Sequence, residues 1–325
     1  MIKLRLPRLL GALAIALALG HPASAQTYPS RTIRIIVPHA PGGATDTLAR
    51  GIAAFAGPVL GQSIIVENRP GASGIIGAEV CAKAAPDGYT LCLTNNDTII
   101  LNPLLYTKLP YDPERDLLPV ANLGTIAGIM IANGSVRANT VTELVAQGKA
   151  NPESIRWSTF GNGSIVHVYS EWLSNSMGAS FLPVHYKGAG PALQAVLAGE
   201  VDASMFGIGP VVQHVRTGRL KALAIVGPKR SPLLPDVPTF LEQGFPFYIT
   251  PWVGLFAPRG TSSDAINKLN ETIQKIASDP AFKTSILDAA TVEFTPGSAA
   301  DFQAYIRKDR QDVGQIVRAS KVRLD

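Results

Sequence analysis

The feature that most constrains the fold is a strand, a glycine turn and a helix in direct succession at residues 33–50, IRIIVPHAPGGATDTLAR. Ile33 to Val37 form an apolar, β-branched run that is typical of a buried strand. Gly42 and Gly43 predict a tight turn into an amphipathic helix that begins near Thr45. Because the first turn of a helix has free N–H groups and the positive end of the macrodipole, this turn is a candidate cradle for a carboxylate or a phosphate.

The same pattern continues over the first hundred residues. The first helix is expected to end near Gly57-Pro58, and SIIVEN (63–68) is typical of a second strand. Residues 75–85 have helical spacing, and the apolar run at 90–94 predicts a third strand. This alternation implies a sheet with parallel neighbours, and a polar cluster at 94–98 follows the third strand where a ligand crevice would lie.

A second α/β unit is predicted in the middle of the chain. Residues 120–132 form a long apolar run, in which Gly124 and Gly128 could mark a crossing from one lobe to the other. From Thr140 the helix and strand pattern restarts, and three of its strands end in glycine turns with the sequences GNGS, KGAGP and GIGP. The proline-rich segment 229–240 then leads back, so the helical C-terminal third is expected to belong with the first lobe.

The N-terminus is predicted to be a secretory signal peptide. Three basic residues within the first eight positions precede an apolar run at 9–19 and an A-x-A cleavage site at 23–25. The mature chain would start at Gln26 outside the cytoplasm, in the periplasm, with no further stretch typical of a membrane helix. We therefore expect a cleaved leader at 1–25, a first lobe made of 26–124 and 229–325, and a second lobe made of 125–228.

Charge excludes one class of partner. Without the leader, 26 basic residues remain against 24 acidic ones, a net charge of about +2 instead of the +5 of the whole chain. No basic block is present, so nothing indicates nucleic-acid binding. The two cysteines, Cys81 and Cys92, could form a disulfide in an exported protein, or both could be ordinary core residues. Two lone cysteines make a poor metal site.

Motifs across the mature chain identify a family. The chain resembles the extracytoplasmic solute receptors of tripartite tricarboxylate transporters, called Bug receptors after the Bordetella uptake genes. The motifs that carry this resemblance are YPSRTIRIIVPHAPGGATD, VENRPGASGIIGAE, AKAAPDGYTL, NPLLYTKLPYDPERDLLPV, GNGSIVH, VHYKGAGPAL, GEVDASMF, KRSPLLPDVPTFLEQG and WVGLFAPRGT. The resemblance implies an α/β, two-lobed periplasmic-binding-protein fold (type II-like, Venus flytrap), in which each lobe is a sheet flanked by helices. It also implies a small carboxylated solute, held between the lobes and handed to a membrane permease.

The resemblance further implies which residues bind the solute, largely through backbone groups and ordered water at the strand-to-helix turns. The first lobe would contribute His39, Pro41, Gly42, Gly43, Thr45, Asn95, Asn96 and Thr98 within the polar turn 95–98. The second lobe would contribute Gly161, Asn162, Gly163, Ser164, Tyr186, Lys187, Gly188, Ala189, Gly207 and Ile208. No metal or cofactor is expected, and we expect a monomer.

Two positions depart from the family pattern. His39 stands where Phe or Tyr is more frequent in the family, and Gly207-Ile208 stands where Asp-Asn is frequent. His39 could donate a hydrogen bond to a carboxylate, with an affinity that rises at mildly acidic pH, or it could only fill the space of an aromatic ring. The absence of the two polar side chains after Phe206 suggests a less polar far end of the solute.

Several polar residues have more than one interpretation. Asp46 lies in the first helical turn and would repel a carboxylate, which favours a structural role. Ser164 can cap a helix, bind solute, or do both. Lys187 can attract an anion or pair with a surface acid. His167 and Glu171 are four residues apart on one predicted helix, but no third metal ligand is evident nearby.

Enzymatic functions are less consistent with the sequence. The nucleophile elbow G-x-S-x-G and the metalloprotease motif H-E-x-x-H are both missing, which disfavours an exported hydrolase. GNGSIV lacks the third glycine of a dinucleotide fingerprint, and no G-K-[ST] is present. A receptor that presents the bound solute to a membrane signalling partner remains open, because it would use the same lobe closure as a transport receptor.

Overall fold

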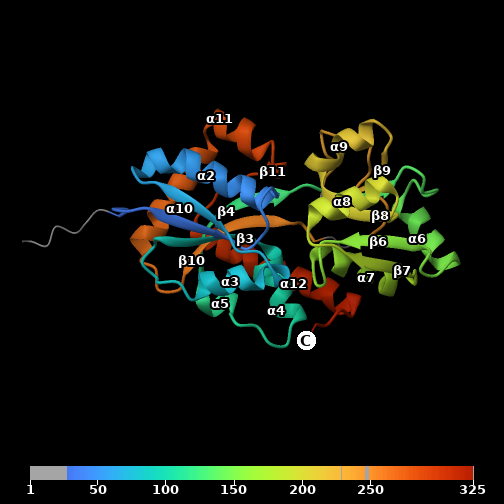
Figure 1. Cartoon of the computed structure of the whole chain (residues 1–325), viewed down its shortest axis with the longest axis horizontal. Coiled ribbons are helices and arrows are strands. Elements are labelled where there is room, and N and C mark those ends of the chain that lie inside the picture. The colour runs from blue at the N-terminus through green and yellow to red at the C-terminus, as the bar shows by residue number, and fades with distance from the viewer. Residues whose placement is uncertain (1–27, 228, 246–248, 325) are drawn as a thin grey trace, which may run out of the picture.

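The computed structural model describes residues 28–227, 229–245 and 249–324 as two lobes that lie side by side, each with a sheet between helices (Figure 1). This arrangement confirms the predicted α/β class. The predicted signal peptide lies outside the described residues. Among the residues that the structure does describe, no helix has both the length and the apolar character needed to cross a membrane.

The sheet of the first lobe has six strands. In spatial order they are β11 (Val292–Glu293), β4 (Leu117–Ile126), β10 (Trp252–Pro258), β3 (Thr90–Asn95), β1 (Ile33–Val37) and β2 (Ile64–Asn68). β1 pairs in parallel with both β2 and β3, as the strand and helix alternation predicted. β10, which comes from the C-terminal third, is antiparallel to β3 and β4. The C-terminal third therefore completes the first sheet.

Helices cover both faces of this sheet. They are α2 (Ala44–Leu60), α3 (Ile75–Ala82), α4 (Asn102–Leu105), α5 (Pro113–Asp116), α10 (Ser263–Ala277), α11 (Pro280–Phe282) and α12 (Ala299–Ser320), together with a 3-10 turn, η1 (Ala72–Gly74), and two π-helical turns, η2 (Asp97–Leu101) and η3 (Lys283–Leu287). Alternate residues of β1 face opposite sides: Ile35 packs with α2 and α10, whereas Ile36 packs in the cluster that contains Phe302 of α12.

The predicted end of the first helix at Gly57-Pro58 was wrong. The helix continues through Pro58 to Leu60. Gly61 then ends it in the left-handed conformation, with φ of 67°, and donates its N–H to the carbonyl of Gly57. Pro58 has no N–H and therefore removes one hydrogen bond in the last turn of the helix. The bond from Gly61 to the Gly57 carbonyl stabilises that turn, so the helix does not stop at the proline.

The second lobe is built around a five-stranded sheet. Its strands, in spatial order, are β7 (Phe181–His185), β6 (Ile155–Thr159), β8 (Ala203–Gly207), β5 (Gly128–Asn133) and β9 (Leu220–Val226). Its helices are α6 (Val141–Ala150), α7 (Ile165–Met177), α8 (Ala189–Ala198) and α9 (Ile208–Arg216). β6, β7 and β8 are parallel, and their carboxyl ends therefore open on the same edge of the sheet.

In the part of the chain that the structure describes, the two sheets are linked near Ala127 and near Pro251, and α12 also packs on α7 of the second lobe. The first is the short link between β4 and β5 at Ala127, where the crossing was predicted. The second runs from β9 to β10, and the Ile126 N–H donates to the Pro251 carbonyl at 2.7 Å, so the two connections lie next to each other. The return segment packs on the second sheet before it crosses, since the Phe240 N–H donates to the Ile225 carbonyl at 3.0 Å. The boundaries at residues 124 and 228 stay a prediction.

Cys81 of α3 and Cys92 of β3 form a disulfide, with their Cα atoms 5.7 Å apart and both side chains buried.

We expect the double variant Cys81→Ala/Cys92→Ala to lose about 3 kcal/mol of unfolding free energy, because the unfolded chain gains entropy when the loop closed by this disulfide is released. Urea denaturation would measure the loss. Wild-type protein in a reducing agent serves as the control and should lose a similar amount, whereas equal stability with and without the reductant would contradict this expectation.

Candidate functional site

The candidate site lies where the predicted turns of the two lobes meet. We call the turns that follow β1, β2 and β3, residues 38–43, 69–74 and 95–98, the first corner. We call the turns that follow β6, β7 and β8, residues 160–164, 186–188 and 207–208, the second corner. In each lobe the strands concerned are parallel neighbours, so these turns gather at one edge of each sheet.

The N-terminus of α2 is open in the first corner. Gly42 and Gly43 are exposed, and a Cβ added to either would meet no heavy atom within 4 Å. Gly43 is the N-cap and provides no side-chain cap for the free N–H groups. Gly42 has φ of +87°, a conformation that glycine adopts without strain. Pro41 is exposed beside them and Thr45 is buried in the first turn, so the α2 N-terminus is uncovered and can bind an anion.

Asp46 has the structural role predicted for it. Its buried carboxylate accepts hydrogen bonds from the Gly42 N–H at 2.9 Å, from Arg50 Nε at 3.0 Å and from Asn68 Nδ2 at 3.0 Å. Burial alone would raise the pKa of Asp46, but these hydrogen bonds outweigh it and lower the pKa. Asp46 therefore holds the glycine turn in place and is already neutralised by its own partners.

The polar turn after β3 contains two kinds of residue: buried ones that bond to backbone carbonyls, and half-buried ones that can reach a solute. Thr98 is fully buried and donates to the Asn95 carbonyl at 3.0 Å, and Asn96 donates to the Thr250 carbonyl at 3.3 Å. Asn95 and Asp97 are only half-buried, and Asn95 Nδ2 lies 3.4 Å from Asp97 Oδ2. We therefore regard Thr98 as part of the scaffold and Asn95 as the residue of this turn that can reach a solute.

His39 follows β1 beside this turn. Burial lowers the pKa of His39 to about 4, and the side chain of Asn95 offsets only part of that shift. In the ligand-free protein a desolvated imidazole favours the neutral form at mildly acidic pH, which disfavours the first of the two interpretations of His39. Its two ring nitrogens are shielded from solvent, and the Asn95 side chain is the polar group beside them. A neutral ring can still donate one N–H to a solute.

In the second corner, the N-terminus of α7 is capped by the protein itself. The Ser164 hydroxyl accepts the His167 N–H at 3.4 Å, which confirms the capping role predicted for Ser164. Nδ1 of His167 accepts the Gly163 N–H at 3.1 Å. Burial, together with the nearby His185, lowers the pKa of His167 to about 4, so the ring is neutral and can act as this acceptor. His167 therefore fixes the GNGS turn.

Among the described residues, no three or more His, Cys, Asp or Glu side chains lie together in a way that could hold a metal ion.

The remaining residues predicted for the second corner differ in their surroundings. The Tyr186 N–H donates to the Thr159 carbonyl at 3.1 Å, which places the turn after β7 beside the turn after β6. Lys187 is exposed, and within the described part of the chain its side chain makes no ion pair with a surface acid. Ile208 is fully buried in the core of the second lobe, and its N–H donates to the Ala127 carbonyl at 3.0 Å. Its side chain cannot line a solute site in this conformation.

The two corners are in contact. Ser73 Oγ donates to the Asn162 carbonyl at 2.8 Å, and the backbone N–H of Ile165 lies close enough to the Asp97 carboxylate to lower its pKa. Ser73 and Asp97 were not among the predicted site residues. Asp97 belongs to the polar turn 95–98, which was a signal for it, whereas Ser73 could be found only from the contact between the lobes.

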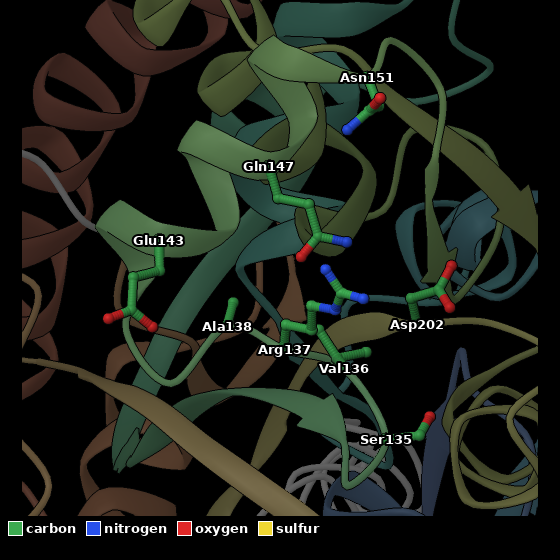
Figure 2. Close-up of a pocket in the computed structure, with 8 residues that line it drawn as sticks. All are labelled: Ser135, Val136, Arg137, Ala138, Glu143, Gln147, Asn151 and Asp202. Atoms are coloured by element: carbon green, nitrogen blue, oxygen red, sulfur yellow. The ribbon is translucent and has the colours of Figure 1, made fainter.

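Two hollows differ in their distance from this junction. One has a volume of about 340 Å³, lies between α7 and residues 320–324, and borders the junction, because Asn162 and His167 are among its lining residues. The other, with about 610 Å³, lies at the far end of the second lobe, where Figure 2 shows the Arg137 guanidinium between Gln147 and Asp202. The second hollow contains none of the residues predicted to bind the solute. The described corners touch each other instead, as expected of a closed receptor.

Comparisons with known proteins show the family and the fold of this chain. The family model described as "Tripartite tricarboxylate transporter family receptor" matches residues 48–322. Protein BugT of Bordetella pertussis is 37% identical over 310 residues, which cover 93% of this chain and 94% of BugT. A solved structure from R. palustris, described as Rpa4515 with adipate, has a TM-score of 0.84 at 28% identity and covers 91% of this chain and 99% of that one. MatC from Rhodopseudomonas palustris with bound malate has a TM-score of 0.82 at 32% identity and covers 89% of this chain and 100% of that one.

Proposed function

Because the chain belongs to the tripartite tricarboxylate transporter receptor family, we propose that it captures a small carboxylated solute between its two corners and delivers it to the membrane permease of such a transporter. The family and the fold are those of periplasmic solute-binding receptors and not of enzymes. The single observation that most supports a carboxylate is the exposed N-terminus of α2, where two glycines leave the free N–H groups uncovered.

The periplasm is the proposed location. The first 25 residues have the pattern of a cleavable signal peptide, and the Cys81–Cys92 disulfide is typical of proteins that fold in an oxidising compartment. Malate and adipate are bound by two structural relatives, and both are small carboxylates. These observations support a small carboxylated solute for this chain.

The proposed mechanism is closure of the two lobes around the solute. The solute carboxylate binds at the N-terminus of α2, and the second corner then closes over it. Contacts such as the one between Ser73 and Asn162 form only in the closed state, and a solute that touches both corners adds its binding energy to that state alone. The closed surface is the form that the permease would recognise.

Thermal denaturation in the presence of a panel of carboxylates tests this function. A cognate carboxylate is expected to stabilise the protein by about 2.7 kcal/mol at a concentration of one hundred times its dissociation constant, because it binds only the folded state. The methyl esters of the same compounds are the matched controls and should give little stabilisation. If the esters stabilised the protein as much as the acids, or if no acid in a broad panel had any effect, the proposal would fail.

A further inference from the structure

The first corner contains an unusual group of polar atoms that have no partner. Oδ1 of Asn95, Asn96 and Asp97 and both ring nitrogens of His39 are shielded from solvent, and none has a partner in good hydrogen-bonding geometry within the described residues. Asn95 lies close enough to His39, and the Ile165 N–H close enough to Asp97, to shift their pKa values, but these contacts leave the group incompletely satisfied. A shielded polar atom without a partner costs about 1–3 kcal/mol, so such atoms are rare and need an explanation. Their concentration in one turn indicates that a binding partner belongs there.

The chemistry of these atoms defines that partner. Three of them are amide or carboxylate oxygens, which only accept hydrogen bonds while Asp97 is ionised, and so they require a donor. Asp97 carries a full negative charge in this state, yet no basic side chain of the described residues forms an ion pair with it. Its polar neighbours are Asn95 and the N-terminus of α7. A cation would complete this set.

Asp97 and the N-terminus of α2 belong to turns at the same edge of the first sheet. Asp97 follows β3, the glycine turn follows β1, and these strands are parallel neighbours, so both lie at the same edge of the sheet. Neighbouring strands are about 5 Å apart. Both turns therefore belong to the first corner, and a zwitterion that spans this edge would place its carboxylate at the α2 N-terminus and its ammonium group at the turn after β3.

We propose that the solute carries an ammonium group as well as a carboxylate, as an amino acid does, and that Asp97 together with Asn95 binds the ammonium group. This inference rests on the proposed function, because it assigns the substrate class of the same site. In the ligand-free protein, burial raises the pKa of Asp97 to about 6, and Asn95 and Ile165 offset only part of that shift. The ammonium group replaces the missing solvation and keeps Asp97 ionised.

A dicarboxylate would need the opposite state of Asp97. Its second carboxylate would be repelled by an ionised Asp97 and could bind only when Asp97 is protonated and donates a hydrogen bond. The two solute classes therefore differ in the sign of their pH dependence. Other ionisable groups on the surrounding elements are His39 after β1, Tyr111 before α5, His167 in α7, and Arg310 of α12, which donates to the Ile99 carbonyl and pairs with Glu114.

Titration calorimetry with matched pairs of compounds tests the proposal. Each pair consists of an amino acid and the same acid without its amino group, for example aspartate and succinate or alanine and propionate. For at least one pair, we expect the amino acid to bind at least about tenfold more tightly at pH 8, and we expect this preference to shrink at pH 5, where Asp97 becomes protonated.

The variant Asp97→Asn should lose the preference for the amino acid and its pH dependence while it still binds the compound that lacks the amino group. Asp309→Asn is the matched control. Asp309 is a buried carboxyl group in α12 whose pKa burial also raises to about 6, but it accepts a hydrogen bond from Trp252 Nε1 at 2.7 Å and takes no part in the corner. This control should keep the preference at both pH values.

The possible outcomes separate the two proposals. Tighter binding of the acid without an amino group, with an affinity that increases towards pH 5, would overturn the ammonium assignment and leave the receptor function intact. A preference for the amino acid that survives in Asp97→Asn would overturn the role of Asp97. If no member of any pair bound, the proposed function itself would fail and the ammonium assignment with it.

Discussion

The variant Gly43→Asp should bind the carboxylated solute at least about one hundred times more weakly than the wild type while its melting temperature stays the same or rises. Gly43 is the N-cap of α2 with φ of −83° and ψ of 172°, a conformation open to any residue, and a Cβ there meets no neighbour. Aspartate is a favoured N-cap residue, so its carboxylate would bond the free N–H groups of α2. It would thereby occupy the position proposed for the solute carboxylate.

Charge is the larger part of this expected loss. Two unit charges about 4 Å apart near a protein surface repel each other by about 4 kcal/mol, which is more than a hundredfold change in affinity requires. Gly43→Asn has nearly the same shape and capping ability but no charge, so it should lose much less affinity. Calorimetry would give the affinities and thermal unfolding the stability. Wild-type affinity in Gly43→Asp would show that the solute does not bind at the N-terminus of α2.

The variant Gly124→Ala should lose about 4 kcal/mol of unfolding free energy, the largest single-residue effect on stability that we expect in this chain. Gly124 has φ of +120°, and an added Cβ would lie 2.1 Å from the carbonyl oxygen of Glu293 and 2.8 Å from the Cα of Phe294. Both atoms are backbone, so β11 would have to move away from β4. The backbone of Gly124 would also have to leave a conformation that alanine rarely adopts.

Gly61→Ala isolates the contribution of the backbone conformation. Gly61 also has a positive φ, of 67°, but an added Cβ meets no heavy atom within 4 Å. Its substitution should cost only about 1 kcal/mol. Urea denaturation of both variants gives the comparison, and similar losses in the two would mean that β11 yields easily and that the contact with Glu293 is unimportant.

The local architecture was predictable because it depends on short-range patterns. The apolar run of β1 and the glycines before α2 are recognisable in the sequence, and parallel pairing with β2 and β3 follows from the alternation of strands and helices. The structural role of Asp46 was also predictable, because a carboxylate in the first turn of a helix interacts with that turn and repels an anion.

What the sequence could not predict depends on distant segments. The antiparallel insertion of β10 between β3 and β4 is decided by the packing of the C-terminal third, and no local pattern records it. The contact between Ser73 and Asn162 joins residues 89 positions apart and exists because the lobes touch. The pKa of His39 depends on burial by neighbours that the sequence does not identify, and that burial favours a neutral ring in the ligand-free protein at a position that could also have been a pH sensor.

The adjacent connections between the lobes set an order for solute capture. Because Ile126 and Pro251 are hydrogen-bonded neighbours, we expect the lobes to rotate about a line that passes close to both. The Ile208 N–H is bonded to Ala127 beside that line, so the turn after β8 stays near its place throughout the swing. The GNGS turn instead meets Ser73 across the junction and must travel. We therefore expect the solute to contact α2 and the turn after β8 first, and the GNGS turn last.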